Sequence, residues 1–204
     1  MYLGQKSICD LYKEWLNEAL PQFYNEIVYY PTHLYYMTNE QKQKILDLKI
    51  NLPEGYKFAE VDFDKDPEII TSAWLHNKKG DLDLTKAKLR NLPCSVIKDV
   101  NDSPISFEMT FPFSLFNHLY TLPEHRGKGL GNATERDLSK KCIRLGITPS
   151  KTIETFNTEV LESSNRSPYW TRWDDEGKPI EYIFMAQECE KRIEMEKNKI
   201  ENGH

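Results

Sequence analysis

The chain has 204 residues, of which 39% are hydrophobic and 29% are charged, a balance typical of a soluble globular protein. No segment approaches the roughly 18 consecutive apolar residues that a membrane-spanning helix requires, which excludes an integral membrane protein and predicts no membrane partner. With 27 basic against 32 acidic side chains, the formal net charge is -5. This charge argues against a general attraction to nucleic acid.

The cysteines belong to no metal-binding or disulfide motif. They stand at positions 9, 94, 142 and 189, far apart and without a Cys-x-x-Cys pair. This spacing favours reduced thiols and predicts no bound metal. The amino terminus, MYLGQKSICDLYKEWL, lacks the long apolar core of a signal peptide and carries early acids and no arginine. It therefore favours an intracellular protein located in the cytoplasm.

The first part of the chain predicts one helix and one extended region. Apolar residues recur at three- and four-residue spacing over residues 7–20, which predicts an amphipathic helix that stops at Pro21. Residues 27–36 are rich in Tyr, Val and Ile. Because Pro31 interrupts them, we expect two short extended pieces rather than one long strand.

A second helix is predicted to start at Thr38. A threonine followed three residues later by Gln41 can form a capping box, and the helix pattern continues through Leu48. Turn-forming residues then occupy 52–56, where we place the main domain boundary. The predicted parts are a shortened amino-terminal extension (1–51), a main domain (52–186) and a charged carboxy-terminal helix or tail (187–204).

Short strands alternate with helices after the boundary. This interleaving predicts an α/β or α+β architecture. The tail from 187 to 201 is dense in both signs of charge, which predicts a solvated helix. In the main domain we expect strands at 57–62, 95–98, 105–110, 115–121, 152–156 and 181–185, and helices at 66–74, 83–92 and 130–145.

The most informative segment is TLPEHRGKGLG, at residues 121–131. It lies between a predicted strand and a long predicted helix, and its glycines stand at alternate positions. Glycines let successive backbone N–H groups converge on a ligand, and the helix start adds a positive dipole. Arg126 and Lys128 supply formal positive charge beside it. The segment therefore predicts an anion-binding loop, with a diphosphate as its natural ligand.

The glycine spacing discriminates among phosphate-binding loops. The triphosphate loop GxxxxGK[ST] is absent, and GKGLG does not have the GxGxxG spacing of dinucleotide-binding proteins. The pattern R-x-x-G-x-G is met by Arg126, Gly129 and Gly131. It resembles the pyrophosphate-binding motif of the GNAT acyltransferase superfamily, which binds acyl-coenzyme A. An ordinary tight turn from strand to helix is the alternative interpretation.

Residues 121–130 further resemble the TLPEYRGQGL-type segment of the glycine N-acyltransferase family. The turn at 52–56 resembles that family's entry into its carboxy-terminal half, and the segments 90–95 and 103–106 resemble its strand hairpin. The resemblance extends over residues 52–175. It implies an α+β fold of the GNAT type: a mixed, mostly antiparallel central sheet flanked by helices, preceded by a short amino-terminal extension.

The resemblance implies transfer of an acyl group from acyl-coenzyme A to glycine or a similar small amine, without a metal. It also implies that the strand at 116–120 splays from its neighbour, so that a backbone N–H is free to bind the thioester oxygen. The family is largely mitochondrial, which implies a mitochondrial location. The resemblance places the contacts to acyl-coenzyme A at Leu119, Tyr120, Thr121, Arg126, Gly127, Lys128, Gly129, Leu130, Gly131 and Asn157.

The catalytic side chains do not carry over directly. In glycine N-acyltransferases the suggested base is a glutamate whose position is Leu115 here. Two nearby residues could serve as the general base instead: His118, which we expect to titrate near neutrality, and Glu108 on the preceding strand. The acid that many GNAT enzymes direct at the thiol corresponds to Ser164. Each has a structural alternative: a packing or solvent-facing histidine, an outward-facing glutamate, and a serine that fills a helix or turn.

Two other functions remain open at this stage. Leu115 at the expected base position favours a non-catalytic protein that binds acyl-coenzyme A or a partner protein. The acidic chain would also suit a GNAT enzyme that acts on the cationic amines of proteins or polyamines.

Overall fold

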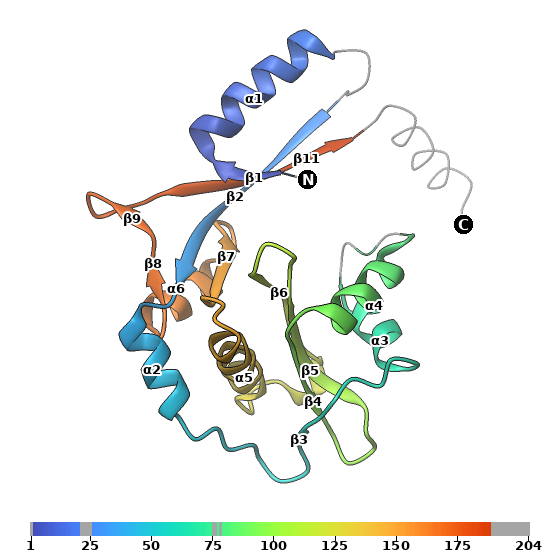
Figure 1. Cartoon of the computed structure of the whole chain (residues 1–204). Coiled ribbons are helices and arrows are strands. Elements are labelled where there is room, and N and C mark those ends of the chain that lie inside the picture. Colours follow the sequence, from blue (N-terminus) through green and yellow to red (C-terminus); the bar gives the residue numbers. More distant parts are fainter. Residues whose placement is uncertain (1, 21–25, 75–76, 78, 189–204) are drawn as a thin grey trace. The chain divides into compact units, whose positions relative to one another are not determined.

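Strands and helices form two units in the computed structural model, which describes residues 2–20, 26–74, 77 and 79–188 (Figure 1). Unit 1 comprises the described parts of Met1–Leu34, Thr152–Arg166 and Arg172–His204, and unit 2 comprises Tyr35–Lys151 and Ser167–Thr171. The predicted α+β class with a mostly antiparallel sheet is confirmed. Within the described ranges, no helix is long and apolar enough to cross a membrane.

Unit 2 contains the sheet that leads into the predicted loop. Its strands pair in the order β7-β6-β5-β4-β3, and every pair is antiparallel except β6 with β7. The short strand β3 ends well before the predicted residue 62, although the Ala59 N–H still donates to the Val96 carbonyl. The strands are β3 (Lys57–Phe58), β4 (Cys94–Lys98), β5 (Pro104–Thr110), β6 (Leu115–Thr121) and the first residues of β7 (Ser150–Glu154).

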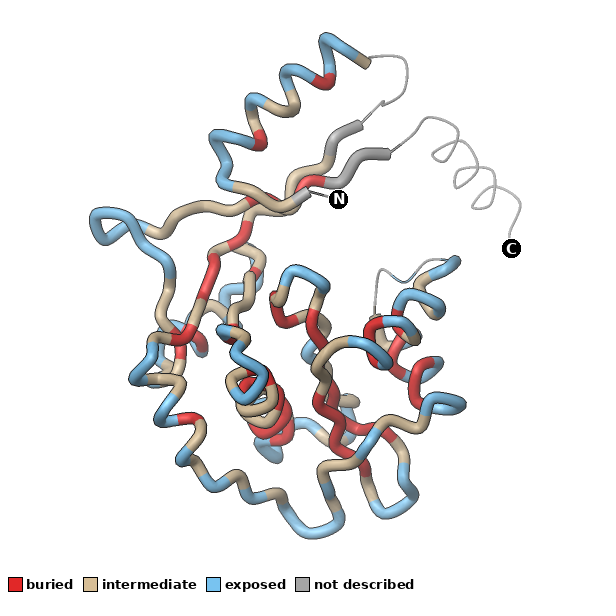
Figure 2. Tube along the Cα trace, viewed as in Figure 1, coloured by how far each residue is buried: buried red, intermediate tan, exposed pale blue. Residues whose placement is uncertain are grey.

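Helices cover both faces of this sheet. Helix α5 (Leu130–Arg144) packs on one face, and α3 (Asp66–Ser72) and α4 (Asp81–Asn91) pack on the other (Figure 1). Because strand side chains alternate between faces, Val96 and Phe107 belong to the α3–α4 layer of the core. Every residue of β5 is consequently buried (Figure 2).

The predicted capping box at Thr38 is confirmed. The Thr38 hydroxyl accepts from the Gln41 N–H, and the Gln41 side chain accepts from the Thr38 N–H, at the start of α2 (Asn39–Asp47). At the other end of α2, the Lys140 ammonium of α5 donates to the carbonyls of Leu46 and Leu48. This contact satisfies carbonyls that have no partner inside the helix.

Unit 1 is built on three antiparallel strands in the order β1-β11-β2. Its core includes Cys9, Ile183 and Met185. The first strand and the small β9–β10 hairpin were not predicted from the sequence. The elements of unit 1 are β1 (Tyr2–Gln5), α1 (Lys6–Ala19), β2 (Glu26–Tyr36), α6 (Thr158–Arg166), β9 (Asp174–Asp175), β10 (Lys178–Pro179) and β11 (Glu181–Glu188); β2 ends and β8 (Thr171–Arg172) begins in unit 2.

The prediction that Pro31 divides residues 27–36 is wrong, because β2 is one strand. Pro31 stands opposite Ile183 of β11, and its carbonyl accepts from the Thr155 N–H. In an antiparallel strand the N–H and C=O of one residue point to the same side, so the missing N–H of Pro31 faces away from β11. The ladder between β2 and β11 therefore loses nothing.

The carboxy-terminal helix was predicted to begin at residue 187, and this start is wrong because residues 187 and 188 are the last two of strand β11. The remainder of that prediction lies outside the described residues. Helix α3 also ends at Ser72, two residues earlier than expected.

A buried ion pair joins α3 to the sheet. The Lys98 Nζ lies 3.0 Å from the Asp66 Oδ2, and the two side chains are 2% and 1% exposed. The same carboxylate oxygen accepts from the Asp62 N–H at 2.8 Å. Because α3 is short, this pair fixes its first turn against β4.

Replacing Lys98 by methionine is expected to lower the free energy of unfolding by about 3–5 kcal/mol, because it leaves the Asp66 charge buried without a partner. The double variant Lys98→Met/Asp66→Asn is expected to recover part of that loss. The matched control is Lys57→Met, which removes an exposed ion pair with Asp102 and is expected to cost about 1 kcal/mol or less. Urea denaturation measures all three, and equal losses for the two single variants would contradict the assignment.

Candidate functional site

The predicted loop leaves β6 through a short 3-10 helix, η1 (Pro123–His125), and reaches α5 at Leu130. Gly127 and Gly129 have φ angles of 74° and 78°, in the left-handed region that favours glycine. A Cβ placed on either glycine would meet no atom within 4 Å. The loop therefore requires glycine for its backbone and leaves open space beside it.

The start of α5 has no protein cap. Gly129 is the N-cap residue and has no side chain to cap the helix, and no side chain of the described residues bonds to the first amides. These N–H groups have no partner inside the helix, and they carry the positive end of the helix dipole. Together with the open space at the glycines, they fit an anionic group such as a diphosphate.

A chain of hydroxyl groups fixes α5 against the sheet below the loop. The Ser106 hydroxyl lies 2.8 Å from both the Thr121 and the Thr134 hydroxyls, and Thr134 donates to the Leu130 carbonyl at 2.9 Å. A Cβ at Gly131 would lie 3.4 Å from the Thr121 Oγ1. A side chain at 131 would thus touch Thr121 at ordinary contact distance, whereas Gly127 and Gly129 favour glycine through their backbone angles.

The charged residues of the loop are held by neighbours. The Arg126 Nε donates to the Thr121 carbonyl at 3.0 Å, and its guanidinium lies over the Tyr120 ring. The Lys128 Nζ donates to the Tyr56 hydroxyl at 2.8 Å, and that hydroxyl lies 2.8 Å from the His125 Nδ1. The Tyr56 hydroxyl therefore links Lys128 to His125, and the His125 tautomer sets the direction of the second hydrogen bond.

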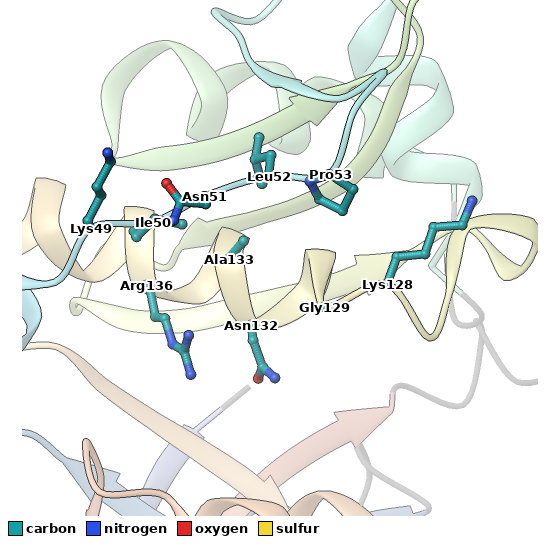
Figure 3. Close-up of a pocket in the computed structure, with 10 residues that line it drawn as sticks. All are labelled: Lys49, Ile50, Asn51, Leu52, Pro53, Lys128, Gly129, Asn132, Ala133 and Arg136. Atoms are coloured by element: carbon teal, nitrogen blue, oxygen red, sulfur yellow. The ribbon is translucent and has the colours of Figure 1, made fainter.

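A pocket of about 430 Å³ lies beside the loop. One wall is the segment 49–53, and the other is the first turns of α5 with Asn132, Ala133 and Arg136 (Figure 3). Lys49, Lys128 and Arg136 bring three cationic side chains to its lining. The pocket thus extends the positive character of the loop along α5.

Strand β6 contains a β-bulge before it reaches the loop. Phe107 pairs with Tyr120 and Met109 pairs with Asn117, so His118 and Leu119 together oppose the single residue Glu108. On its other side β6 pairs with β7 at Leu115–Ser150 and Phe116–Lys151, where the register ends. The bulge leaves residues 118 and 119 outside the β5–β6 register.

His118 lies on the α3–α4 face of the sheet. It has a φ of 63°, and its ring packs edge-on against Phe107 at 5.5 Å and lies 6.0 Å from the Trp74 ring. Its Nε2 is buried without a hydrogen-bond partner in the described part of the chain. Burial, with a contribution from Lys88, lowers the His118 pKa to about 4. The expectation of titration near neutrality is wrong, and the ring is neutral at pH 7.

Glu108 lies on the opposite face, under α5. It is 3% exposed, so the alternative of an outward-facing residue is wrong. Burial and the neighbouring Glu135 raise its pKa well above the ordinary value, against the opposing effect of Lys151. Glu135 itself accepts from Lys151 and from the Trp170 Nε1. The Glu108 Oε2 has no partner among the residues that the structure describes.

The remaining predicted residues divide between the two units. Leu119 is exposed on β6, and Leu115, at the expected base position, is buried. Asn157 and Ser164 belong to unit 1. Asn157 is exposed just before α6, where its carbonyl accepts from the Leu161 N–H, and Ser164 is buried within α6.

The sequence analysis missed four residues that shape the site: Lys49, Tyr56, Lys88 and Arg136. Tyr56 had a signal, because it ends the turn that resembles the glycine N-acyltransferases. The three cationic residues stand in ordinary charged segments and had none. In the described ranges, no group of three or more His, Cys, Asp or Glu side chains could hold a metal ion.

Comparison with protein-family models and with curated proteins finds no match. Solved structures do match. A Drosophila protein from a structural genomics consortium superposes with a TM-score of 0.70 at 19% identity, over 89% of this chain and 58% of its own. A GCN5-related N-acetyltransferase from Sphaerobacter thermophilus superposes with a TM-score of 0.56 at 11% identity, over 92% of this chain and 58% of its own. A GNAT-family acetyltransferase from Colwellia psychrerythraea superposes with a TM-score of 0.57 at 10% identity, over 91% of this chain and 63% of its own.

These similarities show that the chain has the fold of the GNAT acetyltransferases. The chain spans less than two thirds of the length of each of these three structures. The resemblance of residues 121–131 to the GNAT superfamily is therefore supported at the level of the fold, and none of the matching structures points to the glycine N-acyltransferases in particular.

The neutral His118, whose Nε2 is buried, is expected to make stability depend on pH. Its folded-state pKa of about 4 lies below the ordinary histidine value of 6.5, so the unfolded chain binds more protons between these values. Stability should therefore fall by up to about 3 kcal/mol as the pH drops through this window. His118→Asn, which tolerates the positive φ, is expected to flatten this slope in urea denaturation. An unchanged slope would contradict the burial of a neutral imidazole.

Glu108 is expected to act in the opposite direction. Its raised folded-state pKa means that the folded protein holds the proton more tightly, so stability is lost as the pH rises from the ordinary carboxyl range through that pKa. Glu108→Gln keeps the shape of the neutral acid and is expected to gain stability over the wild type as the pH rises. The check is the difference in urea midpoints between the two proteins across a pH series; a difference that stays constant would contradict the prediction.

Proposed function

We propose that this protein binds acyl-coenzyme A at residues 126–131 and transfers the acyl group to the amine of glycine or a similar small acceptor. The observation that carries the proposal is the uncapped start of α5, entered through two left-handed glycines in a GNAT fold. Gly80 at the start of α4 has the same open space and positive φ, and the start of α5 differs from it in having two such glycines, Gly127 and Gly129.

The residues present fit the charges of coenzyme A. The amides of the loop and of the first turn of α5 would hold the diphosphate, with the Lys128 ammonium beside them. Lys49 and Arg136 offer further positive charge in the adjoining pocket, to which the remaining phosphate of coenzyme A is suited. When bound, acyl-coenzyme A supplies an activated thioester.

The chain's own groups meet part of the chemical demand of acyl transfer. The bulged backbone at His118–Leu119 is suited to donate a hydrogen bond to the thioester oxygen. The attacking amine must be neutral, and the buried surroundings of His118 favour an uncharged amine. With a pKa of about 4, the imidazole is a weak base. Its role in this proposal is to accept a hydrogen bond from the amine through Nε2 and so orient it.

Glycine as acceptor and a mitochondrial location rest on the TLPE-type resemblance of residues 121–130.

The second candidate function is a protein that binds acyl-coenzyme A without catalysis. It is favoured by Leu115, a buried apolar residue where a base is expected, and by the low pKa of His118. Binding at the loop is common to both candidates, so the two are distinguished by turnover.

Replacing Gly129 by leucine is expected to weaken acetyl-coenzyme A binding by about tenfold or more, because the side chain enters the space beside the loop amides. Gly80→Leu is the matched control: Gly80 is the N-cap of α4, has a φ of 100° and is equally open. Both variants carry a comparable backbone strain, so only the first should alter binding. Calorimetry measures the affinities. If folded Gly129→Leu binds acetyl-coenzyme A as tightly as the wild type, the loop is not the binding site.

Thiol release from acetyl-, benzoyl- and longer acyl-coenzyme A, with and without glycine and a panel of small amines, tests catalysis. Release that depends on the acceptor supports an acyltransferase. Calorimetric binding without release across the panel supports the non-catalytic alternative, and the absence of both overturns the proposal.

A further inference from the structure

The cationic side chains of the loop and of the first turns of α5 are held by tyrosines. Residues 126–136 contain three of these cations, and none of them forms a salt bridge within the described ranges. Each cation lies over an aromatic ring instead, in the pairs Arg126–Tyr120, Lys128–Tyr56 and Arg136–Tyr169, at 5.3, 5.3 and 5.2 Å from the ring centres.

Carboxylates stand on either side of Arg136 in the sequence, but they are engaged elsewhere. Glu135 accepts from the Lys151 ammonium, and Asp137 lies 2.9 Å from the Lys141 ammonium. The next cations along the chain are thus neutralised by acids, whereas the Arg136 guanidinium lies over a ring. The choice of partner therefore changes between the start of α5 and the residues beyond it.

A tyrosine ring and a carboxylate hold a cation with different consequences. The ring attracts the cation through its quadrupole and carries no net charge, so the positive charge stays available to an anion. A carboxylate would neutralise the cation, and a phosphate would have to displace it. Ordering a long, flexible side chain during binding opposes binding, and a side chain that is held beforehand avoids that loss.

Two of these cations, Lys128 and Arg136, line the pocket beside the loop (Figure 3). The contact of Lys128 is the more complete, because its Nζ also donates to the Tyr56 hydroxyl at 2.8 Å. Tyr56 is itself fixed on two sides: its hydroxyl lies 2.8 Å from the His125 Nδ1, and its ring packs against the core around Ile97. The Lys128 ammonium is thus tied to the folded core of unit 2.

We propose that Tyr56 and Tyr169 are positioning residues, which hold Lys128 and Arg136 at the pocket with their charges free to bind the phosphates of the acyl donor. This inference rests on the proposed function and adds two residues that act on the ligand only through a cation. Loss of either tyrosine therefore matters for binding only while its cation is present.

The first test measures the affinity for acetyl-coenzyme A by calorimetry. Tyr169→Leu is expected to weaken binding about two- to tenfold, because Arg136 loses the ring that holds it. Tyr169→Phe keeps the ring and is expected to retain the wild-type affinity. Phe63→Leu is the matched control: it removes the ring over which Arg90 lies at 5.6 Å, outside residues 126–136, and is expected to leave the affinity unchanged.

Double-mutant cycles separate positioning from a structural effect. In an Arg136→Gln protein, the further change Tyr169→Leu is expected to leave the affinity unaltered, because no charge remains to be positioned. Tyr56→Phe and Lys128→Gln form a second cycle, in which Tyr56→Phe removes only the hydroxyl and is expected to weaken binding about two- to tenfold. If Tyr169→Leu does not fold, the second cycle decides. Tyrosine losses of equal size with and without the cation, or no loss at all, overturn the inference.

The inference and the proposed function fail in different ways. Acetyl-coenzyme A binding that no tyrosine variant changes leaves the proposed site standing and removes the positioning role. If the wild type does not bind acetyl-coenzyme A, the proposed function is overturned, and sodium pyrophosphate is titrated into the same variants. Pyrophosphate binding that depends on each tyrosine only with its cation present supports the positioning role by itself, and absence of pyrophosphate binding overturns it.

Discussion

The close approach of α5 to strands β5 and β6 is the constraint on which the loop depends. Ser106 joins Thr121 to Thr134 through hydroxyl contacts of 2.8 Å, and Gly131 leaves just enough room for the Thr121 side chain. Because the helix start is held there, its free amides are fixed at the end of β6 rather than left to a mobile loop. The geometry of the proposed anion site is thus prepared by packing within unit 2.

The sheet separates two buried polar groups that have different electrostatic characters. On the α5 face, burial and the neighbouring Glu135 raise the pKa of Glu108, and Lys151, which pairs with Glu135, opposes that effect. On the α3–α4 face, Lys88 and His118 are both disfavoured as cations by burial. In a regular register His118 would stand opposite Glu108 and share its face, but the bulge and the positive φ of His118 turn its ring to the other face.

A GNAT fold does not by itself establish an activity, because folds host many functions and chemistry resides in sites. What narrows the proposal here is the coincidence of three local features in unit 2. The left-handed glycines leave space, the bulge removes His118 and Leu119 from the ladder, and the buried Lys88 forms no salt bridge among the described residues. In the proposed function, the first two features would contact the diphosphate and the thioester oxygen of the acyl donor.

Local signals in the sequence were sufficient for the elements around the loop. The strand at 115–121 was predicted with the observed bounds, the helix from 130 to within one residue, and the Thr38 capping box with both of its hydrogen bonds. Each depends on neighbouring residues alone: alternation, a glycine before a helix, or a cap three residues from its partner. The requirement for glycine in the loop was likewise visible in the spacing.

Tertiary structure alone decided burial, charge pairing and the strand that contains Pro31. Which side of Pro31 faces β11 depends on the strand order, and the pKa of His118 depends on Phe107, Trp74 and Lys88 packing around it. The link from Lys128 to Tyr56 joins residues 72 positions apart. Such effects are set by groups that are distant in sequence and close in space, so the pattern of any one segment does not contain them.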